Sequence, residues 1–196
     1  MQKLNTGYYK TFAAFSFMLM ISSCSNTKFL QEGQMLYTGA KITVKNDTLS
    51  KKEKSNLKDA LQEQLRPKPN SSFLGLRPRL YVYNITKEPK KQKGIGYWLK
   101  YKIGEKPVLL GDVDREFNKK IIVNYSENKG FFNAEASSDT IAKNKKAQVL
   151  YTVKPGARYL ISQVNFPVDS TVINSEIQSI KDKSFLKAGN PFDLDV

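Results

Sequence analysis

Hydrophobic and polar positions alternate along residues 36–45, and this period of two predicts a half-buried strand. Its apolar members are Leu36, Ala40, Ile42 and Val44. Two further strands are predicted at residues 134–142 and 147–153, the second from the alternation of its apolar residues. Lys143, Asn144 and Lys145 separate the two runs, so together they predict a β-hairpin, which Pro155 and Gly156 close.

Residues 50–65 show the spacing of an amphipathic helix instead. Ser50 followed by Glu53 is the pattern of a capping box, and apolar residues recur on one face after it. These residues are Leu57, Ala60, Leu61 and Leu65. Pro67 is expected to end the helix, because the residue before a proline is disfavoured in the α region.

A second helix is predicted after an acidic cluster formed by Asp112, Asp114 and Glu116. Its apolar residues recur every four positions: Val113, Phe117, Ile121 and Tyr125. The acidic side chains are a candidate cation site, but acids also favour the first turn of a helix, and this capping role is the preferred interpretation. Lys129 and Gly130 supply a helix stop.

Residues 66–111 are rich in proline and glycine and contain a basic run from residue 87 to 93. We interpret this stretch as an insertion with one short element at residues 80–85. Basic and aromatic residues interleave just before and within that element: Arg77, Arg79, Tyr81 and Tyr83. Such interleaving suits stacking on nucleic acid, yet a packed amphipathic segment is the favoured interpretation.

The last forty residues predict a new unit. Residues 159–166 are expected to form a strand, and Asp169, Ser170 and Thr171 are candidate caps for the helix that follows. That helix carries Val172, Ile173, Ile177 and Ile180, and residues 187–192 form a turn before a further helix begins at Asp193. A strand and a helix alone do not bury their apolar faces, so this unit is expected to be truncated.

The order strand, helix, insertion, helix, strand, strand predicts an α+β fold, with the helices on one face of a small sheet. The expected organisation is a signal at residues 1–23, a linker at 24–34, a domain at 35–156 with its insertion at 66–111, and the start of a second domain at 157–196.

The N-terminus predicts secretion and lipidation. Lys3 and Lys10 precede an apolar run at residues 11–21, which has the length of a signal peptide and is too short to span a bilayer. Ile21-Ser22-Ser23-Cys24 then resembles the lipobox of bacterial lipoproteins, so Cys24 is expected to be acylated, with palmitate among its acyl chains. The alternative, a buried thiol, has no apolar surroundings to support it. The residues after Cys24 favour an outer-membrane anchor that faces the periplasm.

Composition narrows the chemistry. The sequence has no histidine and a single cysteine, which excludes intrachain disulfides, His/Cys metal sites, Ser-His-Asp triads and Cys-His pairs. No cofactor is expected. The formal charge is +14, and removal of Lys3 and Lys10 leaves 14 − 2 = 12 positive charges on the secreted part. This excess reflects either an ordinary lysine-rich surface or acidic envelope partners, and nucleic acid is not expected outside the cytoplasm.

Several segments together resemble POTRA domains, the periplasmic modules of the BamA/TamA outer-membrane assembly superfamily. Gly130-Phe131-Phe132-Asn133-Ala134 is similar to the Gly-Tyr-Phe-x-Ala that leads from the second POTRA helix into a strand. The other similar segments are residues 149–156 (VLYTVKPG), the pattern Tyr159-x-Ile161-x-x-Val164-x-Phe166, and residues 187–193 (KAGNPFD). Residues 28–30, 36–37, 68–70 and 104–107 look like a lipoprotein-anchored branch, so the resemblance covers residues 26–196.

This resemblance implies binding rather than catalysis. POTRA domains are thought to receive unfolded outer-membrane proteins or assembly partners, and an exposed sheet edge accepts an added strand from many sequences. The candidate edge is the strand at residues 134–142, chosen because Ala134, Ala136 and Ser138 are small. The residues expected to bind a partner are Ala134, Glu135, Ala136, Ser137 and Ser138. Members of the superfamily continue into a membrane β-barrel, so we expect this chain to be the front part of a larger protein.

Two other functions stay open from the sequence. A self-contained periplasmic scaffold would bind an anionic envelope polymer through Lys87, Lys90, Lys91 and Lys93, with steep salt dependence. A glycan hydrolase would need two paired carboxylates, but the acidic residues fall mainly at helix starts and turns, so an enzyme is not expected.

Overall fold

The computed structural model describes residues 26–166 and 171–194. The predicted signal at residues 1–23 and the predicted lipidation site Cys24 lie outside the described residues, as do the candidate caps Asp169 and Ser170.

The described chain has an α+β fold built on a small mixed sheet, as the residue pattern predicts. The strands are β1 (Leu36–Val44), β2 (Glu135–Lys143) and β3 (Lys146–Lys154), in the order β1-β3-β2. The N–H of Leu36 donates to the carbonyl of Lys145 and that of Lys45 to the carbonyl of Val153, each at 2.8 Å, so β1 runs parallel to β3. β2 and β3 form the predicted antiparallel hairpin.

The hairpin turn consists of two residues, Asn144 and Lys145, with φ angles of 53° and 57°. Positive φ at both central positions is the signature of a type I′ turn, whose twist matches that of the flanking strands. Lys143, expected in the turn, is the last residue of β2.

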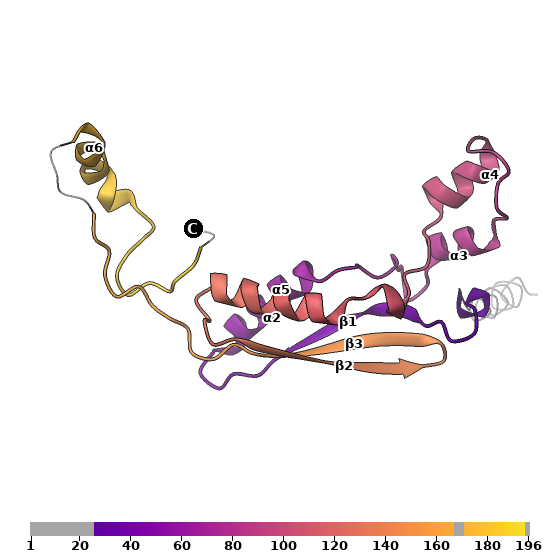
Figure 1. Ribbon diagram of the computed structural model, residues 1–196, viewed down its shortest axis with the longest axis horizontal. Helices are drawn as coiled ribbons and strands as arrows, with labels where there is room; N and C mark the ends of the chain where they lie inside the picture. Colours follow the sequence, from indigo (N-terminus) through magenta and orange to yellow (C-terminus); the bar gives the residue numbers. More distant parts are fainter. Residues whose placement is uncertain (1–25, 167–170, 195–196) are drawn as a thin grey trace, which may run out of the picture. The chain divides into compact units, whose positions relative to one another are not determined.

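Helix α2 (Lys51–Gln64) begins at the predicted capping box. The Ser50 hydroxyl accepts the Glu53 N–H at 3.2 Å, and the Glu53 carboxylate accepts the Ser50 N–H at 2.9 Å. Leu57 and Leu61 are buried, and the helix ends before Pro67 as predicted. In Figure 1, α2 lies beside α5 (Arg115–Asn128) on one face of the sheet.

The predicted apolar face of α5 is wrong by one residue. Phe117 is 55% exposed, whereas Asn118, Ile122 and Ser126 are buried. The cause is a pair of hydrogen bonds from the Asn118 amide to the backbone of Arg66: its oxygen accepts the N–H at 3.0 Å and its nitrogen donates to the carbonyl at 2.7 Å. These bonds partner the backbone just beyond the end of α2, so the helix presents its Asn118 face inward.

The chain divides into two compact units. One contains the described residues up to 39 together with 67–113 and 142–148, and its core includes Leu30, Leu36 and Leu80. The other contains residues 40–66, 114–141 and 149 onward. Its buried apolar residues are Ile42, Leu57, Leu61, Leu65, Ile122, Phe131, Val149, Tyr151 and Val153.

The predicted insertion is more helical than expected. The element predicted at residues 80–85 is α3 (Pro78–Ile85), and it is followed by α4 (Ile95–Trp98), a π-helical turn η2 (Leu99–Ile103) and a 3-10 turn η3 (Leu110–Asp112). A further 3-10 turn, η1 (Asn26–Phe29), contacts α3. The structure therefore supports a packed segment rather than a stacking surface: Arg79 Nε donates to the carbonyl of Ile103 at 3.0 Å.

The strand predicted at residues 159–166 is not present. This segment instead has an isolated bridge between Leu160 and Pro191, and the backbone hydrogen bonds beside it join residues 159–161 to residues 189–192, a pairing too short to form a strand. The following helix is confirmed as α6 (Val172–Ile180), with the Thr171 hydroxyl accepting the Asn174 N–H at its start. The 3-10 turn η4 (Lys181–Lys183) completes the elements of the described chain.

Candidate partner-binding edge

β2 is an outer strand of the sheet, so one side of its backbone has no neighbouring strand in the described chain. The two-residue turn makes Lys143 and Lys146 the pair that closes the hairpin. Alternation along an antiparallel pair then directs the backbone groups of Glu135 and Ser137 toward β3 and those of Ala136 and Ser138 outward. The register therefore supplies two outward N–H donors within the predicted binding segment.

The side chains of this segment leave the edge accessible. Ala136 and Ser138 are half-buried and small, and Glu135 and Ser137 are exposed. Ala134 lies just before β2, with its N–H donating to the carbonyl of Phe131 at 3.2 Å. Natural edges are commonly blunted by proline, bulges or inward lysines, and residues 135–138 contain no proline or lysine.

The next outward N–H along β2 belongs to Thr140 and is already hydrogen-bonded within the chain. The Asp139 carboxylate accepts the N–H of Thr140 at 2.7 Å, and the Thr140 hydroxyl accepts a bond from the Arg115 guanidinium at 3.3 Å. The open stretch of the edge thus ends at Ser138, where the predicted segment also ends.

The opposite edge of the sheet is covered in part. The Tyr37 N–H donates to the carbonyl of Val108 at 2.9 Å, and the Leu110 N–H donates to the carbonyl of Met35 at 2.9 Å. Farther along β1, the Gln62 side chain donates to the carbonyl of Ala40 at 3.0 Å. These contacts occupy groups that a guest strand would need, so β2 is the more accessible edge.

The connection between α5 and β2 is fixed by Gly130. Its N–H donates to the carbonyl of Glu127 and the N–H of Phe131 donates to that of Ser126, both at 2.9 Å, which forms a Schellman motif. Gly130 has φ +85°, a conformation that suits glycine. Phe131 is buried under the Arg158 guanidinium, 5.5 Å from its ring centroid, and so anchors the chain where it turns toward β2.

The C-terminal segment packs on the same corner. The Tyr159 N–H donates to the Gly130 carbonyl at 2.8 Å, and the Leu194 N–H donates to the carbonyl of Asn128 at 2.9 Å. Lys129 forms a 2.8 Å ion pair with Asp193. The segments that resemble successive POTRA motifs therefore meet at Gly130, a contact that the sequence pattern did not predict.

A cavity of about 210 Å³ lies between α2 and the end of α5. It is lined by Leu49, Glu53, Asn56, Leu57, Ala60, Tyr125, Lys129, Phe131 and Arg158. Glu53 is held in the capping box, where its hydrogen bonds to Ser50 lower the pKa of its carboxyl group. Lys129 and Arg158 are similarly engaged, with Arg158 Nε donating to the Lys129 carbonyl at 2.9 Å. The charged side chains that line the cavity are therefore engaged in contacts that hold α2 and the end of α5 in place.

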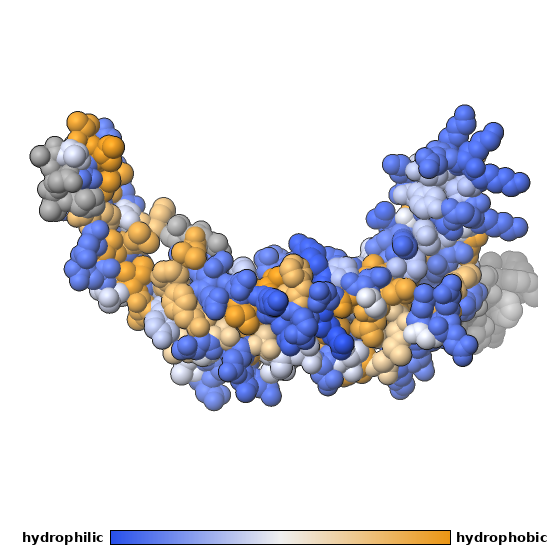
Figure 2. Space-filling view, viewed as in Figure 1, coloured by the Kyte–Doolittle hydropathy of each residue, from blue (hydrophilic) through white to orange (hydrophobic). Residues whose placement is uncertain are grey.

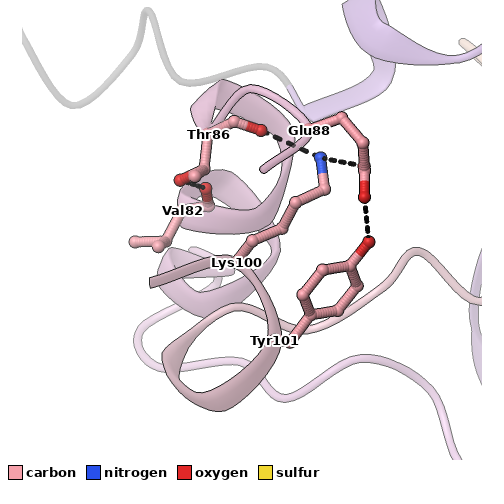
Figure 3. A network of polar contacts seen from close by, with 5 residues as sticks. All are labelled: Val82, Thr86, Glu88, Lys100 and Tyr101. Atoms are coloured by element: carbon pink, nitrogen blue, oxygen red, sulfur yellow. Dashed lines mark hydrogen bonds and ion pairs between the residues drawn. The ribbon is translucent and has the colours of Figure 1, made fainter. Parts of the chain in front are cut away.

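A polar network in the other unit holds the basic loop between α3 and η2 (Figure 3). Lys100 is almost buried, and its Nζ donates to the carbonyl of Thr86 at 2.9 Å and lies 3.4 Å from the Glu88 carboxylate. The Tyr101 hydroxyl donates to the same carboxylate. This hydrogen bond lowers the pKa of Glu88 and raises the pKa of Tyr101 to about 12. The sequence offered only the lysine run as a signal, and the network was not predicted.

Of the three acids before α5, Asp114 caps this helix, as the preferred interpretation predicts, and Asp112 caps the turn η3. Glu116 lies in the first turn of α5 and forms a 2.8 Å ion pair with Lys119. Asp114 accepts the N–H of Phe117 at 2.9 Å, and Asp112 accepts the N–H of Leu109 at 2.8 Å. Among the residues that the structure describes, no group of three or more His, Cys, Asp or Glu side chains is placed to hold a metal ion. In the same described ranges, no helix combines the length and the apolar character needed to cross a bilayer.

Comparison with known proteins leaves the family open. No protein-family model matches the chain, and no curated protein matches it. Among solved structures the chain is similar to the crystal structure of Haemophilus influenzae BamA POTRA3-5, with 14% identity over 85% of this chain and 84% of that chain and a TM-score of 0.26.

Proposed function

We propose that this chain is the lipid-anchored, periplasmic part of an outer-membrane assembly factor of POTRA type. In this proposal Cys24 is acylated and holds the protein at the outer membrane, and the β2 edge binds extended segments of unfolded outer-membrane proteins or of assembly partners. The proposed role is binding, without catalysis or a cofactor.

The observation that supports this proposal best is the open edge at residues 135–138. Ala136 and Ser138 direct N–H and C=O groups outward, beside small side chains that do not obstruct an incoming strand. Strand addition depends on backbone hydrogen bonds, which any extended sequence supplies, and this suits a protein that receives many clients. The lipobox-like Ile21-Ser22-Ser23-Cys24 supports the anchor.

The edge is tested with the Ser138→Pro variant. Proline removes the outward N–H at residue 138 and leaves the bonds between β2 and β3 in place. The probe is a fluorescent peptide of about ten alternating valine and threonine residues, the length of a transmembrane β-strand, followed by fluorescence anisotropy. We expect Ser138→Pro to weaken binding about tenfold and the matched Ser138→Ala variant, which keeps the N–H, to bind as the native chain does.

A circular dichroism melt confirms that each variant is folded. Equal peptide affinity of a folded Ser138→Pro variant and the native chain would place binding away from β2. The anchor is tested separately by palmitate labelling in bacteria, where the native chain should incorporate label and Cys24→Ala should not. Labelling that persists in Cys24→Ala contradicts the assignment of Cys24.

A further inference from the structure

The loop between α3 and α4 concentrates positive charge on an exposed surface. Residues 87–93 contain four lysines and one glutamate, and all four lysines are exposed. The lysines are Lys87, Lys90, Lys91 and Lys93. None of them takes part in an ion pair with another described residue, whereas Glu88 is paired with Lys100. The surface of this helical segment is accordingly strongly hydrophilic (Figure 2).

Exposed apolar side chains follow the lysines directly. Ile95 is 78% exposed and Trp98 is 53% exposed. They stand three residues apart on α4, a spacing that places them on the same side of a helical turn. Trp98 is the single tryptophan of the chain. Tryptophan beside lysine is the combination enriched at the boundary between lipid headgroups and acyl chains.

The loop is held in a defined position rather than left to solvent. Lys100 joins the end of α3 to the loop through the Thr86 carbonyl and the Glu88 carboxylate, and its ammonium group lies 4.6 Å from the centroid of the Tyr83 ring. Tyr97 and Tyr101 pack with ring centroids 5.1 Å apart. The charged loop and the apolar turn are therefore presented together by one packed cluster.

The segment that carries this cluster contacts residues that follow the proposed anchor in the sequence. Asn26 follows Cys24 by two residues, and its amide donates to the carbonyl of Arg77, the N-cap of α3, at 3.3 Å. Leu30 is buried in one core with Leu36 and Leu80. In the sequence, the proposed lipidation site is therefore only two residues from a side chain that contacts this segment.

We propose that this helical segment, residues 78–103, docks on the anionic phospholipid surface of the membrane that carries the anchor. The lysines of residues 87–93 bind the phosphate headgroups, and Ile95 and Trp98 enter the interface. The inference rests on the proposed lipid anchor for its place in the cell, but its contact surface is separate from the β2 edge. Docking would add a surface contact to the one made by the acyl chains and would fix how the module is oriented on the membrane.

The test uses the chain from residue 24 onward with Cys24→Ser, which keeps every described residue and carries no lipid. The probes are vesicles of phosphatidylcholine with and without about a quarter of phosphatidylglycerol. We expect the protein to float with the anionic vesicles and the emission of Trp98 to shift to shorter wavelength, and binding to fall as salt is raised. Neutral vesicles should produce neither change.

Two variants with the same charge loss separate a specific surface from general attraction. Replacement of Lys87, Lys90, Lys91 and Lys93 by glutamine should weaken vesicle binding about 100-fold, since each lysine near an anionic surface contributes severalfold. Replacement of Lys51, Lys52, Lys58 and Lys120, which are exposed elsewhere, should weaken it less than tenfold. Trp98→Ser should reduce binding without changing its salt dependence.

Equal losses in the two glutamine variants, or Trp98 emission that does not move, would overturn the docking proposal. Tighter binding to heparin, a soluble polyanion, than to anionic vesicles would also overturn it, in favour of a polymer-binding surface. The β2 proposal is judged independently, because the glutamine variants should retain peptide affinity and Ser138→Pro should retain vesicle binding. A native chain that binds the peptide but does not bind anionic vesicles would therefore contradict docking alone.

Discussion

At the residue scale, Gly130 determines both how α5 ends and how closely the C-terminal segment packs against it. A Cβ atom at this position would lie 2.8 Å from the carbonyl oxygen of Phe192 and 3.3 Å from that of Tyr159. The residue also has a positive φ, which a non-glycine residue adopts at a cost of about 1 kcal/mol. The helix stop and the packing of the C-terminal segment therefore depend on the same missing side chain.

We predict that Gly130→Ala lowers the free energy of unfolding by about 2 kcal/mol or more, because backbone strain and a steric clash add. Urea denaturation measures this change. Gly111→Ala is the matched control, since a Cβ atom there meets nothing within 4 Å, and it should change stability by less than about 0.5 kcal/mol. Equal effects of the two substitutions would show that Gly130 has no special role.

The hydrogen bond between Glu88 and Tyr101 predicts two pH limits for the basic loop. The pKa of Glu88 is lowered on folding, so its contribution is present above the usual carboxyl pKa and is lost as pH falls through the lowered value. The pKa of Tyr101 is raised to about 12, so its contribution is present below about pH 10 and is lost as pH rises toward 12.

Spectroscopic titration of tyrosine ionisation measures the alkaline limit. Burial also raises the pKa of Tyr151, so the native chain should show more than one late-ionising tyrosine, and Tyr101→Phe should remove one of these late steps while the rest of the curve is unchanged. Trp98 fluorescence should change over the same pH range in the native chain, because the loop beside it loses its tie to η2. An unchanged titration curve in Tyr101→Phe would contradict the prediction.

At the scale of elements, local patterns predicted most of the framework. The capping box at Ser50, the period of two in β1 and the hairpin were all read from neighbouring residues, because their determinants are local. The face of α5 was not, since a four-residue repeat that starts at Val113 differs from the buried repeat at Asn118 by a single position. The choice is made by the backbone of Arg66, which is distant in the sequence.

Asn118→Ala tests that explanation. Removal of the amide leaves the N–H and the carbonyl of Arg66 without these partners, and we predict a loss of about 2 kcal/mol of unfolding free energy. Thermal or urea denaturation measures it. Asn124→Ala, on the exposed side of the same helix, is expected to be nearly neutral. A neutral Asn118→Ala would mean that other contacts set the orientation of α5.

At the scale of the whole molecule, the sequence suggested a candidate edge but not the direction of its backbone groups. Small side chains indicated residues 134–138, whereas the direction of each N–H follows from the two-residue turn at Asn144 and Lys145. The hydrogen bonds that cover the β1 edge come from Val108 and Leu110, and no repeat in the sequence indicates that these residues lie beside β1. The contact of Gly130 with Phe192 could not be predicted either, because a local sequence pattern does not show which distant segments meet.

Asp139 sets the length of the edge, and its removal is predicted to extend it. Asp139→Ala frees the N–H of Thr140, so we expect tighter binding of the alternating peptide and more self-association by light scattering. Glu135→Ala removes the same charge from the same strand without freeing a backbone group, and should leave both properties near those of the native chain. Similar behaviour of the two variants would attribute the effect to charge alone.

The short edge also determines how long a guest can stay. Ala136 and Ser138 offer two donors and two acceptors, and a hydrogen bond contributes about 1 kcal/mol net, before the guest loses its conformational freedom. On the proposed function, we therefore expect short dwell times and release without an energy source. Because the Asp139–Thr140 contact keeps the edge short, the module is suited to pass a bound segment to the next partner rather than to hold it.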